Sequence, residues 1–503
     1  MAAGVSPLVL DADHAPTAAE AATRLPEWLA RALPAALPDC RWFGDKDRGV
    51  RSVRVVDLAV DPDDGGWFAW ARLSVEFERG PLADYGIPLA SQAGRADDAY
   101  VVVETPSGAF SVVDGVASDR FPAWWCRRQL AGGALAARHG RLEFVPLPGL
   151  ARREAALAAE PGRSLAAEQS NTNLRYGDTM VAKIFRRLEP GLNPDVETST
   201  RLWQAGGFRA MPEPLATVAY RDAEPWTVGF SQAFVANRGD GWAWVLDGLR
   251  EVAGGGDAAP LVAAVGTLGE RTAQMHAALA ACGDDAPFAP EPVDAVAGGA
   301  LVASASENLG RTLGALREFG PTLAAADRDA ADRAVAAEGQ LRERLDGFRA
   351  LVGTVAVRVH GDFHLGQVLR TTEDDWAILD FEGEPARPMA ERRRKQSVLK
   401  DVGGLLRSLD YARGATVAAM PDGSAALADW LVAARTAFLG AYRSTLAATG
   451  GVPLVPADDV AFGRALDAWV LDKALYEVRY ELANRPAWVG LPLGALLRDP
   501  AEP

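Results

Sequence analysis

Two aspartates and an amide, close together in the chain, are the residues whose types and spacing could do chemistry. Asp362 follows His360 and Gly361 in VRVHGDFHLGQVLR, Gln367 comes five residues later, and Asp380 opens DFE 18 residues after Asp362 (380 − 362). Transfer of a γ-phosphoryl group to a hydroxyl needs one carboxylate to accept the hydroxyl proton, and a second carboxylate with an amide to hold Mg²⁺ on the phosphates. The order predicts Asp362 as the catalytic residue and Gln367 and Asp380 as metal ligands.

Both motifs also have structural explanations. An aspartate after a strand often forms a turn or caps a helix, and an amide such as Gln367 can tie down its own loop. The alternating apolar segment 355–359 precedes Asp362, however, and the apolar run 376–379 precedes Asp380. A strand is therefore predicted before each aspartate, which favours a catalytic loop followed by a metal-binding loop.

A lysine that could bind the phosphates lies upstream. Segment 180–185, MVAKIF, is a predicted strand that carries Lys183, and Glu197 follows 14 residues later (197 − 183) where NPDVETSTRLW predicts the start of a helix. A glutamate on that helix could pair with the lysine and orient it toward the phosphates. An isolated lysine on a strand is otherwise a solvated edge residue. The pairing of Lys183 with Glu197 is the expectation that favours a nucleotide site.

The segment just before this strand, EQSNTN at 168–173, occupies the place of a phosphate loop. It lacks a G-x-G-x-x-G pattern, so hydroxyl, amide and backbone N–H groups would have to bind the phosphates. Ser170 and Asn171 are the residues predicted to do so.

Together these segments resemble the bacterial maltokinases and the actinobacterial glucosamine kinases, in the aminoglycoside-phosphotransferase-like branch of the protein-kinase-like fold. The similarity runs in blocks from about Arg41 to about Gly494, through EQSNTN, VAKIFRRLEPGLNPDVE, FSQAFVANRGDGWAW, HGDFHLGQVLR, DFEGEPARP and DKALYEVRYELANRP. The resemblance implies a sugar kinase that uses ATP and Mg²⁺. RWFGDKDR at 41–48 departs from the usual RWFAGKGR form of the maltokinases at Gly44, Asp45 and Asp47.

The fold that the resemblance implies is α+β: a bilobal protein-kinase-like fold with an N-terminal cap subdomain. We expect a mostly antiparallel β cap at 1–110, a small nucleotide-binding lobe at 111–235 and a mainly helical C-terminal lobe at 236–503. Strand-like runs support the cap and alanine- and leucine-rich helical patterns support the last lobe. The predicted strands are 53–59 and 67–77, and the predicted helices are 261–279, 324–351 and 427–446.

The hinge that binds adenine is placed by the resemblance at 232–235, with Gln232, Phe234 and Val235 as nucleotide-binding residues. Kinase hinges bind adenine through backbone groups, so the side chains there carry little information. A plain β-strand is equally compatible with this sequence.

The acceptor site is expected to combine polar and charged groups that bind hydroxyls. An amino sugar is a cation that favours an unpaired carboxylate, whereas a disaccharide needs a longer groove with aromatic rings. The breadth of the resemblance favours maltose, giving maltose 1-phosphate; the alternative is glucosamine, giving glucosamine 6-phosphate, and a third is a kinase-like binding protein without catalysis. An internal ion pair between Glu384 and Arg387 is the structural alternative. The predicted acceptor residues are His364, Glu382, Glu384, Arg387 and Tyr411.

Composition sets limits on partners and location. The 503 residues are 49% apolar and 24% charged, which is typical of globular proteins. A net charge of −15 disfavours nucleic acid and anionic membranes as partners. We found no apolar run long enough to span a bilayer and no signal-peptide pattern, and the three cysteines show no metal-binding spacing. A cytoplasmic location is expected, and the sequence does not indicate an oligomeric state.

Overall fold

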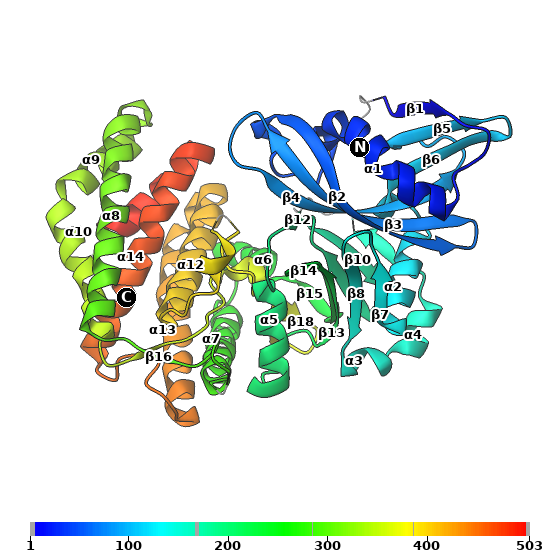
Figure 1. The fold of residues 1–503 in the computed structure, drawn as a ribbon. Coiled ribbons are helices and arrows are strands. Elements are labelled where there is room, and N and C mark those ends of the chain that lie inside the picture. Colours follow the sequence, from blue (N-terminus) through cyan, green and yellow to red (C-terminus); the bar gives the residue numbers. More distant parts are fainter. Residues whose placement is uncertain (1–5, 166–170, 284, 386, 499–503) are drawn as a thin grey trace. The chain divides into compact units, whose positions relative to one another are not determined.

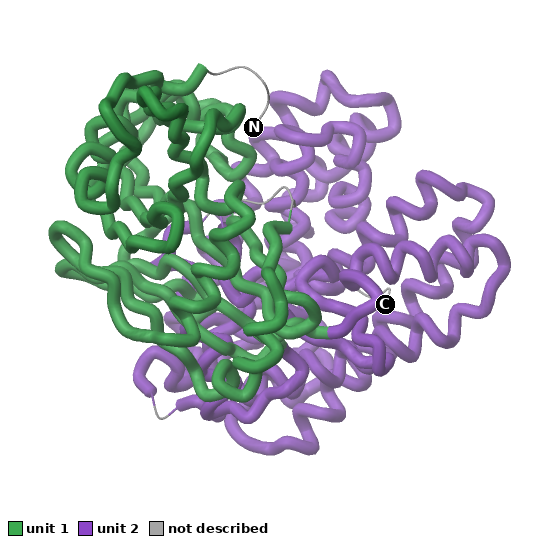
Figure 2. The backbone as a smooth tube through the Cα atoms, turned by 90° about the vertical axis from the view of Figure 1, so that its right-hand side faces the viewer, with its two compact units in different colours: residues 1–196, 212–235 green, residues 197–211, 236–503 purple. Residues whose placement is uncertain are grey.

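The computed structural model describes residues 6–165, 171–283, 285–385 and 387–498 (Figure 1). Two compact units divide the chain (Figure 2). The first contains residues 1–196 and 212–235, and the second contains residues 197–211 and 236–503. The expected cap and nucleotide lobe thus belong to one unit, and the change of unit after Val235 coincides with the expected start of the helical lobe.

The first sheet of unit 1 is the expected cap. Its strand order is β1-β5-β6-β4-β3-β2, with β12 paired to β4, and all its pairs are antiparallel except β1 with β5. Its last long strand ends four residues after the expected boundary at 110 (114 − 110). The strands are β1 (Leu8–Asp11), β2 (Val50–Asp63), β3 (Gly66–Phe77), β4 (Ala83–Ala93), β5 (Val101–Thr105), β6 (Gly108–Asp114) and β12 (Arg187–Leu188).

Helix α1 (Ala18–Ala36) completes the cap. Thr17 and Glu20 form a capping box at its start, in which each side chain accepts from the other residue's backbone N–H. Its buried face carries Leu25, Leu29 and Leu33 at helical spacing, and these pack in the same apolar cluster as the cap strands.

The second sheet of unit 1 carries Lys183. Its order is β7-β8-β13-β14-β11-β10-β9. Strand β11 pairs with β10 on one side and β14 on the other, so Lys183 lies on an interior strand and is not an edge lysine. The strands are β7 (Gly133–Ala136), β8 (Arg141–Pro146), β9 (Arg163–Leu165), β10 (Thr172–Tyr176), β11 (Met180–Ile184), β13 (Pro214–Arg221) and β14 (Pro225–Ala233).

A fully buried arginine links the two sheets of unit 1. Arg186 Nε donates to the Thr172 hydroxyl at 2.9 Å, and its Nη2 donates to Asp114 at 2.9 Å. Its guanidinium lies over the Trp42 ring, 4.7 Å from the centroid, and the Trp42 indole N–H also donates to Asp114. Phe43 is fully buried. The aromatic pair of RWFGDKDR therefore belongs to the packing of the cap.

Unit 2 is mainly helical, and its helices share one apolar core. The predicted helices 261–279 and 427–446 lie within α7 and α13. The predicted single helix 324–351 is wrong: α9 ends at Ala336, α10 begins at Glu338, and a 3₁₀ turn completes the segment. The helices are α6 (Gly241–Ala253), α7 (Ala259–Ala281), α8 (Ala295–Phe319), α9 (Ala325–Ala336), α10 (Glu338–Leu345), α11 (Met389–Arg392), α12 (Leu399–Ala419), α13 (Ser424–Thr449), α14 (Asp459–Asn484) and α15 (Gly490–Leu497).

Short strands in unit 2 lead into the two aspartate loops. β19 (Trp376–Ile378) pairs with β18 (Val368–Thr371), which pairs with β15 (Asn237–Asp240), so the strand expected before Asp380 is confirmed. The strand expected at 355–359 is shorter than predicted. Only β17 (Val355–Ala356) forms, paired with β16 (Glu291–Pro292), because the alternate valines that follow are buried in a small apolar cluster instead of extending a sheet.

Two further expectations concern membranes and thiols. Within the described residues, no helix is both long enough and apolar enough to cross a membrane. Cys40, Cys126 and Cys282 are buried and form no disulfide bond with one another.

Candidate active site

Lys183 projects from β11 to a buried carboxylate. Its ammonium lies 3.2 Å from Asp195, whose side chain is 1% exposed. Asp195 is in the first turn of α5 (Pro194–Arg201), and its backbone N–H donates to the Asn193 side chain at 2.8 Å. Asn193 before Pro194 is a favourable start for a helix, because the amide caps a free N–H and proline lacks one. The local sequence thus holds the lysine's partner rigidly.

Glu197, the expected partner of Lys183, has another role. Its carboxylate accepts from Arg358 at 2.9 Å and from Arg393 at 2.9 and 2.6 Å. Side chains two residues apart on a helix point to different faces, so Asp195 and Glu197 cannot share one partner. The expected pairing is therefore corrected: Asp195 holds Lys183, and Glu197 joins two arginines within unit 2.

The predicted phosphate loop and hinge are only partly described. Ser170 lies outside the described residues, and Asn171 directly precedes β10. Gln232 is in β14, opposite Val181. The Phe234 N–H donates to the Thr179 carbonyl at 3.1 Å. That N–H is therefore already paired within unit 1, and the predicted role of the segment in adenine binding stays a prediction.

A buried aspartate holds the loop that carries Asp362. The carboxylate of Asp401, on α12, accepts from the backbone N–H of His360 at 2.8 Å and from that of Gly361 at 2.9 Å. It also lies 3.1 Å from His276 Nε2. Burial alone would raise the pKa of Asp401, but the hydrogen bonds and charge of His276 and the backbone donors lower it overall. The residue before the catalytic aspartate is therefore fixed by an ionised, fully buried group.

The catalytic loop and the DFE loop are joined directly. His360 Nε2 donates to the Leu379 carbonyl at 2.7 Å, and the Leu379 N–H donates to the Gln367 carbonyl at 2.9 Å. Gly361 has φ of +88°, and a Cβ there would lie 3.1 Å from Gly383 Cα. This close approach requires glycine, which explains why each motif contains one.

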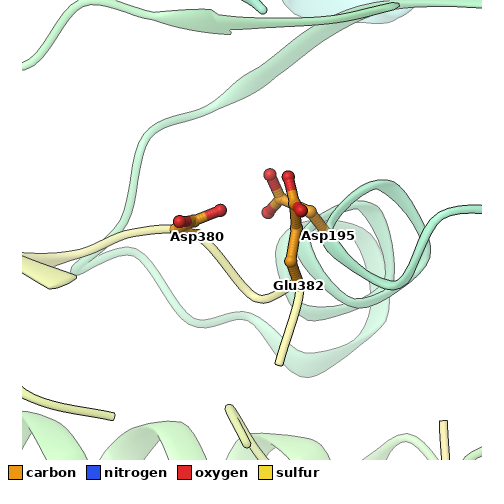
Figure 3. Close-up of side chains that lie close together, drawn as sticks. All are labelled: Asp195, Asp380 and Glu382. Carbon is orange, nitrogen blue, oxygen red and sulfur yellow. The ribbon is translucent and has the colours of Figure 1, made fainter. Parts of the chain in front are cut away.

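The predicted metal ligands offer oxygen atoms from these loops. Asp380 has φ of +64°, an unfavourable conformation for a residue with a Cβ that is most often found at functional sites. Carboxylate oxygens of Asp380 and Glu382 lie within 4.8 Å of each other. Figure 3 draws both on the loop after β19, and Asp195 on α5. The half-buried Gln367 makes no side-chain hydrogen bond with the described residues. Such a donor set fits Mg²⁺, which prefers oxygen ligands.

A cavity of about 530 Å³ opens beside Asp362 in unit 2. Of the predicted acceptor residues, Glu384 and Arg387 line it with Asp362, whereas His364, Glu382 and Tyr411 do not. Its walls also come from one face of α8 and one face of α14. The polar residues with which these two helices line the cavity are Ser304, Asn308, Arg311, Asp472, Lys473, Tyr476 and Arg479.

Lys473, on α14, lies between two carboxylates of this cavity. Its ammonium is 3.6 Å from Asp362 and 3.5 Å from Glu384. Glu384 also pairs with Arg387 at 2.5 Å, which confirms the ion pair considered from the sequence. Burial raises the pKa of Glu384, but these cations, Lys473 first, lower it overall. Asp362, Glu384 and Lys473 thus form a charged part of the cavity wall.

Asp472 differs from these acids because it forms no ion pair with the described residues, although the charges of Arg387 and Lys400 are near enough to act on it. It accepts a hydrogen bond from the Asn308 amide at 2.6 Å. Burial raises its pKa. It is therefore a carboxyl group in the cavity wall that a bound cation would stabilise.

The acceptor residues outside the cavity have local partners. His364 Nδ1 accepts from the Gly366 N–H at 3.0 Å and so caps the short turn that contains Gln367. The Tyr411 hydroxyl donates to Glu481 at 3.1 Å. These contacts hold both side chains in place. His364 Nε2 also lies 3.9 Å from Asp362, and a role of either residue in acceptor binding stays a prediction. Sequence reasoning missed Asp401, Asp472 and Lys473; only DKALYEV in the C-terminal block of similarity pointed to the last two.

Comparisons with known proteins agree with this geometry. A model of the phosphotransferase enzyme family matches residues 162–384. A glucosamine kinase of Streptacidiphilus jiangxiensis is 33% identical over 340 residues, covering 66% of this chain and 71% of that protein. A glucosamine kinase of Mycolicibacterium smegmatis is 30% identical over 353 residues, covering 68% and 80%.

Solved structures extend the similarity to nearly the whole chain. A glucosamine kinase in complex with glucosamine, ADP and inorganic phosphate is 26% identical, with a TM-score of 0.64, covering 94% of this chain and 98% of that one. Another crystal form of a glucosamine kinase has a TM-score of 0.66 at 25% identity and the same coverage. This chain therefore belongs to the phosphotransferase enzyme family, in the kinase-like group that includes the actinobacterial glucosamine kinases.

Proposed function

We propose that the protein is an ATP- and Mg²⁺-dependent glucosamine kinase that forms glucosamine 6-phosphate. The observation that carries this proposal is Asp472, a carboxyl group that forms no ion pair with the described residues and lines the same cavity as Asp362. Glucosamine bears an ammonium group near neutral pH, and maltose does not. The relatives are glucosamine kinases, so the expected order of acceptors is reversed and maltose becomes the second candidate.

Asp362 is the proposed catalytic residue. Its carboxylate accepts the proton of the sugar hydroxyl as the oxygen attacks the γ-phosphorus of ATP. The bond from that phosphorus to the β,γ-bridging oxygen breaks, and ADP leaves with the electron pair. The transition state is loose, so correct placement of the hydroxyl contributes more than strong base chemistry. Lys473, 3.6 Å from Asp362, helps to orient the aspartate.

The phosphates of ATP are assigned to Lys183, which Asp195 orients. Asp380 and Gln367 are the proposed metal ligands, and Glu382, which lies beside Asp380, joins them in place of its expected role in acceptor binding. When bound, the metal ion neutralises charge on the β- and γ-phosphates. A cytoplasmic location, where ATP is available, stays a prediction.

The acceptor's ammonium group is assigned to Asp472, with Glu384 nearby in the same cavity. Binding of the cation stabilises the charged form of a carboxyl, which burial disfavours. Glucose, which has a hydroxyl at the same carbon, cannot do so. Charge recognition at Asp472 therefore discriminates between two sugars of nearly equal size.

The test of the reaction is ADP release measured with glucosamine, maltose and glucose, with phosphorus NMR of the product. We expect glucosamine to be used fastest and the phosphate to be on O6. Asp362→Asn should lower kcat by about a thousandfold or more while ATP binding persists, since general base catalysis and hydroxyl placement are lost together. Preference for maltose, or ATP binding without turnover of any sugar, would favour the two alternative functions.

The test of charge recognition is Asp472→Asn, which keeps shape and removes charge. We expect kcat/KM for glucosamine to fall at least about tenfold more than that for glucose, because only the amino sugar loses an ionic partner. Asp459→Asn, an exposed position at the start of the same helix, is the matched control. Equal losses for both sugars would remove Asp472 from ammonium binding.

A further inference from the structure

The acceptor cavity ends at two arginines on neighbouring helices. Arg311 of α8 and Arg479 of α14 both line it. The helices are side by side (Figure 1), and hydrogen bonds connect Asn308 to the Asp472 carbonyl at 3.1 Å and Thr312 to the Leu475 carbonyl at 2.9 Å. The two helices therefore run parallel. Arg311 follows Asn308 on α8 and Arg479 follows Asp472 on α14, so both arginines lie on the C-terminal side of this contact.

No carboxylate among the described residues forms an ion pair with either arginine. Arg479 Nη1 donates to the carbonyls of Asn308 and Leu475, each at 3.2 Å, and to the Thr312 hydroxyl, all of which are neutral. Arg311 is exposed to the cavity side and has no hydrogen bond or ion pair to the described residues. Two positive groups thus face the same end of one cavity.

The electrostatics agree with this arrangement. Burial lowers the pKa of Arg479 first, and the charge of Arg311 lowers it further, while Asp472 and Tyr476 act in the opposite direction. Burial raises the pKa of the nearby Asp472, which disfavours its negative charge, so this acid offsets the positive charge of the two arginines only in part. An anion between the two guanidinium groups would relieve their repulsion.

The arginines are separated along the helix axis from the lysine that contacts Asp362. Lys473, which contacts Asp362, precedes Arg479 by six residues on α14, or about 9 Å along the helix axis. The cavity volume of about 530 Å³ is in the range of about 300 to 1,000 Å³ that holds drug-sized ligands. A hexosamine is much smaller than such a ligand, so room remains between it and the arginines.

We propose that the acceptor is a glucosamine derivative with an anionic group at the end away from the phosphorylated hydroxyl, and that Arg311 and Arg479 bind this group. This inference rests on the proposed glucosamine kinase function. Phosphate, sulfate and carboxylate share the required chemistry, because planar guanidinium groups bind their oxygens in pairs. An anion attached at the anomeric carbon is separated from O6 by the ring oxygen and carbons C5 and C6, so it leaves O6 free to be phosphorylated.

The test compares four acceptors with the wild-type protein: glucosamine, methyl glucosaminide, glucosamine 1-phosphate and carboxymethyl glucosaminide. Methyl glucosaminide controls for the added substituent, and the last two distinguish a phosphate from a carboxylate. We expect kcat/KM for at least one anionic acceptor to exceed that for methyl glucosaminide about tenfold, the effect of one charge-assisted contact. Equal values for all substituted acceptors would overturn the inference.

Variants connect the preference to the arginines. Arg311→Gln should reduce the ratio of anionic to methyl acceptor at least about fivefold, since one of two cationic contacts is lost. Arg317→Gln, an exposed arginine on the same helix that pairs with Glu338, is the matched control and should keep the ratio. Arg311 is exposed, so its replacement should not impair folding. Arg479 also donates to two backbone carbonyls, so it is replaced by lysine, which keeps the positive charge.

The outcomes separate the two proposals. If glucosamine is phosphorylated but anionic acceptors have no advantage, or the advantage survives Arg311→Gln, only this inference fails. If glucosamine is not phosphorylated at all, the proposed function fails and the inference fails with it.

Discussion

Replacing Asp195 should impair use of ATP, whereas replacing Glu197 should impair stability. Lys183 and Asp195 are 3.2 Å apart with side chains 17% and 1% exposed, and unit charges at that distance interact by about 5 kcal/mol at an effective dielectric constant of 20. Desolvation offsets part of this, and truncating one partner of such a pair typically costs about 2 to 5 kcal/mol. Asp195→Asn should therefore lower kcat/KM for ATP by about 30-fold or more, since 1.4 kcal/mol corresponds to tenfold.

Glu197→Gln is the matched comparison two residues away. It removes the charge that Arg358 and Arg393 share, which leaves buried Arg358 without an ionic partner and should lower the free energy of unfolding by about 3 to 5 kcal/mol. The assays are ADP release against ATP concentration and urea unfolding at one temperature. If Glu197→Gln raises KM for ATP in the folded protein and Asp195→Asn does not, the assignment of Asp195 as the carboxylate that orients Lys183 is refuted.

Four other changes have defined outcomes. Lys473→Met should move the acidic limb of the pH–rate profile to higher pH, because burial raises the pKa of Glu384 and Lys473 is the main group that lowers it; activity is then lost at higher pH as the acid is protonated, and Lys473→Arg should keep the wild-type profile. Asp401→Asn should destabilise the fold by about 3 kcal/mol in urea and lower kcat, since two backbone donors lose an ionic acceptor. Gly361→Ala should lower kcat with a small change in KM for ATP, because its Cβ would push against the metal loop; unchanged kcat would count against that contact. Asp380→Ala should shift the Mg²⁺ titration to higher concentration, and an identical titration would reassign Asp380 to structure.

Short sequence patterns predicted the parts of the site whose residues lie close together in the chain. A strand, an aspartate and an amide within one loop can be recognised because each depends on its immediate neighbours, and the Asp362 and Asp380 loops are where the pattern indicated. The interior strand that holds Lys183 was equally recognisable. The sequence could not decide between Asp195 and Glu197 as the partner of Lys183. Both are acids near the start of one helix, and the rotation of this helix about its axis determines which of them faces the lysine.

The remaining parts depend on contacts between distant segments. Asp401 and Lys473 lie on helices whose apolar pattern predicts a buried face. The pattern does not show which loop the two side chains contact. Helix α1 was missed because Pro26 and Pro34 interrupt its pattern, although its buried face and capping box sustain it. The length of the strand before Asp362 was overestimated because buried valines alternate in the same way whether or not a partner strand is present.

Residues of α14 line the acceptor cavity, so the cavity cannot form before the ribosome has synthesised this helix. Lys473 leaves the ribosome 111 residues after Asp362 (473 − 362), an interval of about 6 to 20 s at translation rates of 5 to 20 residues per second. Until α14 packs against α8 and α12, a nascent chain has its catalytic aspartate but neither the lysine beside it nor Asp472 in the cavity wall. Acceptor binding should therefore appear late and in one step during biosynthesis, after the nucleotide-binding sheet has been synthesised in full.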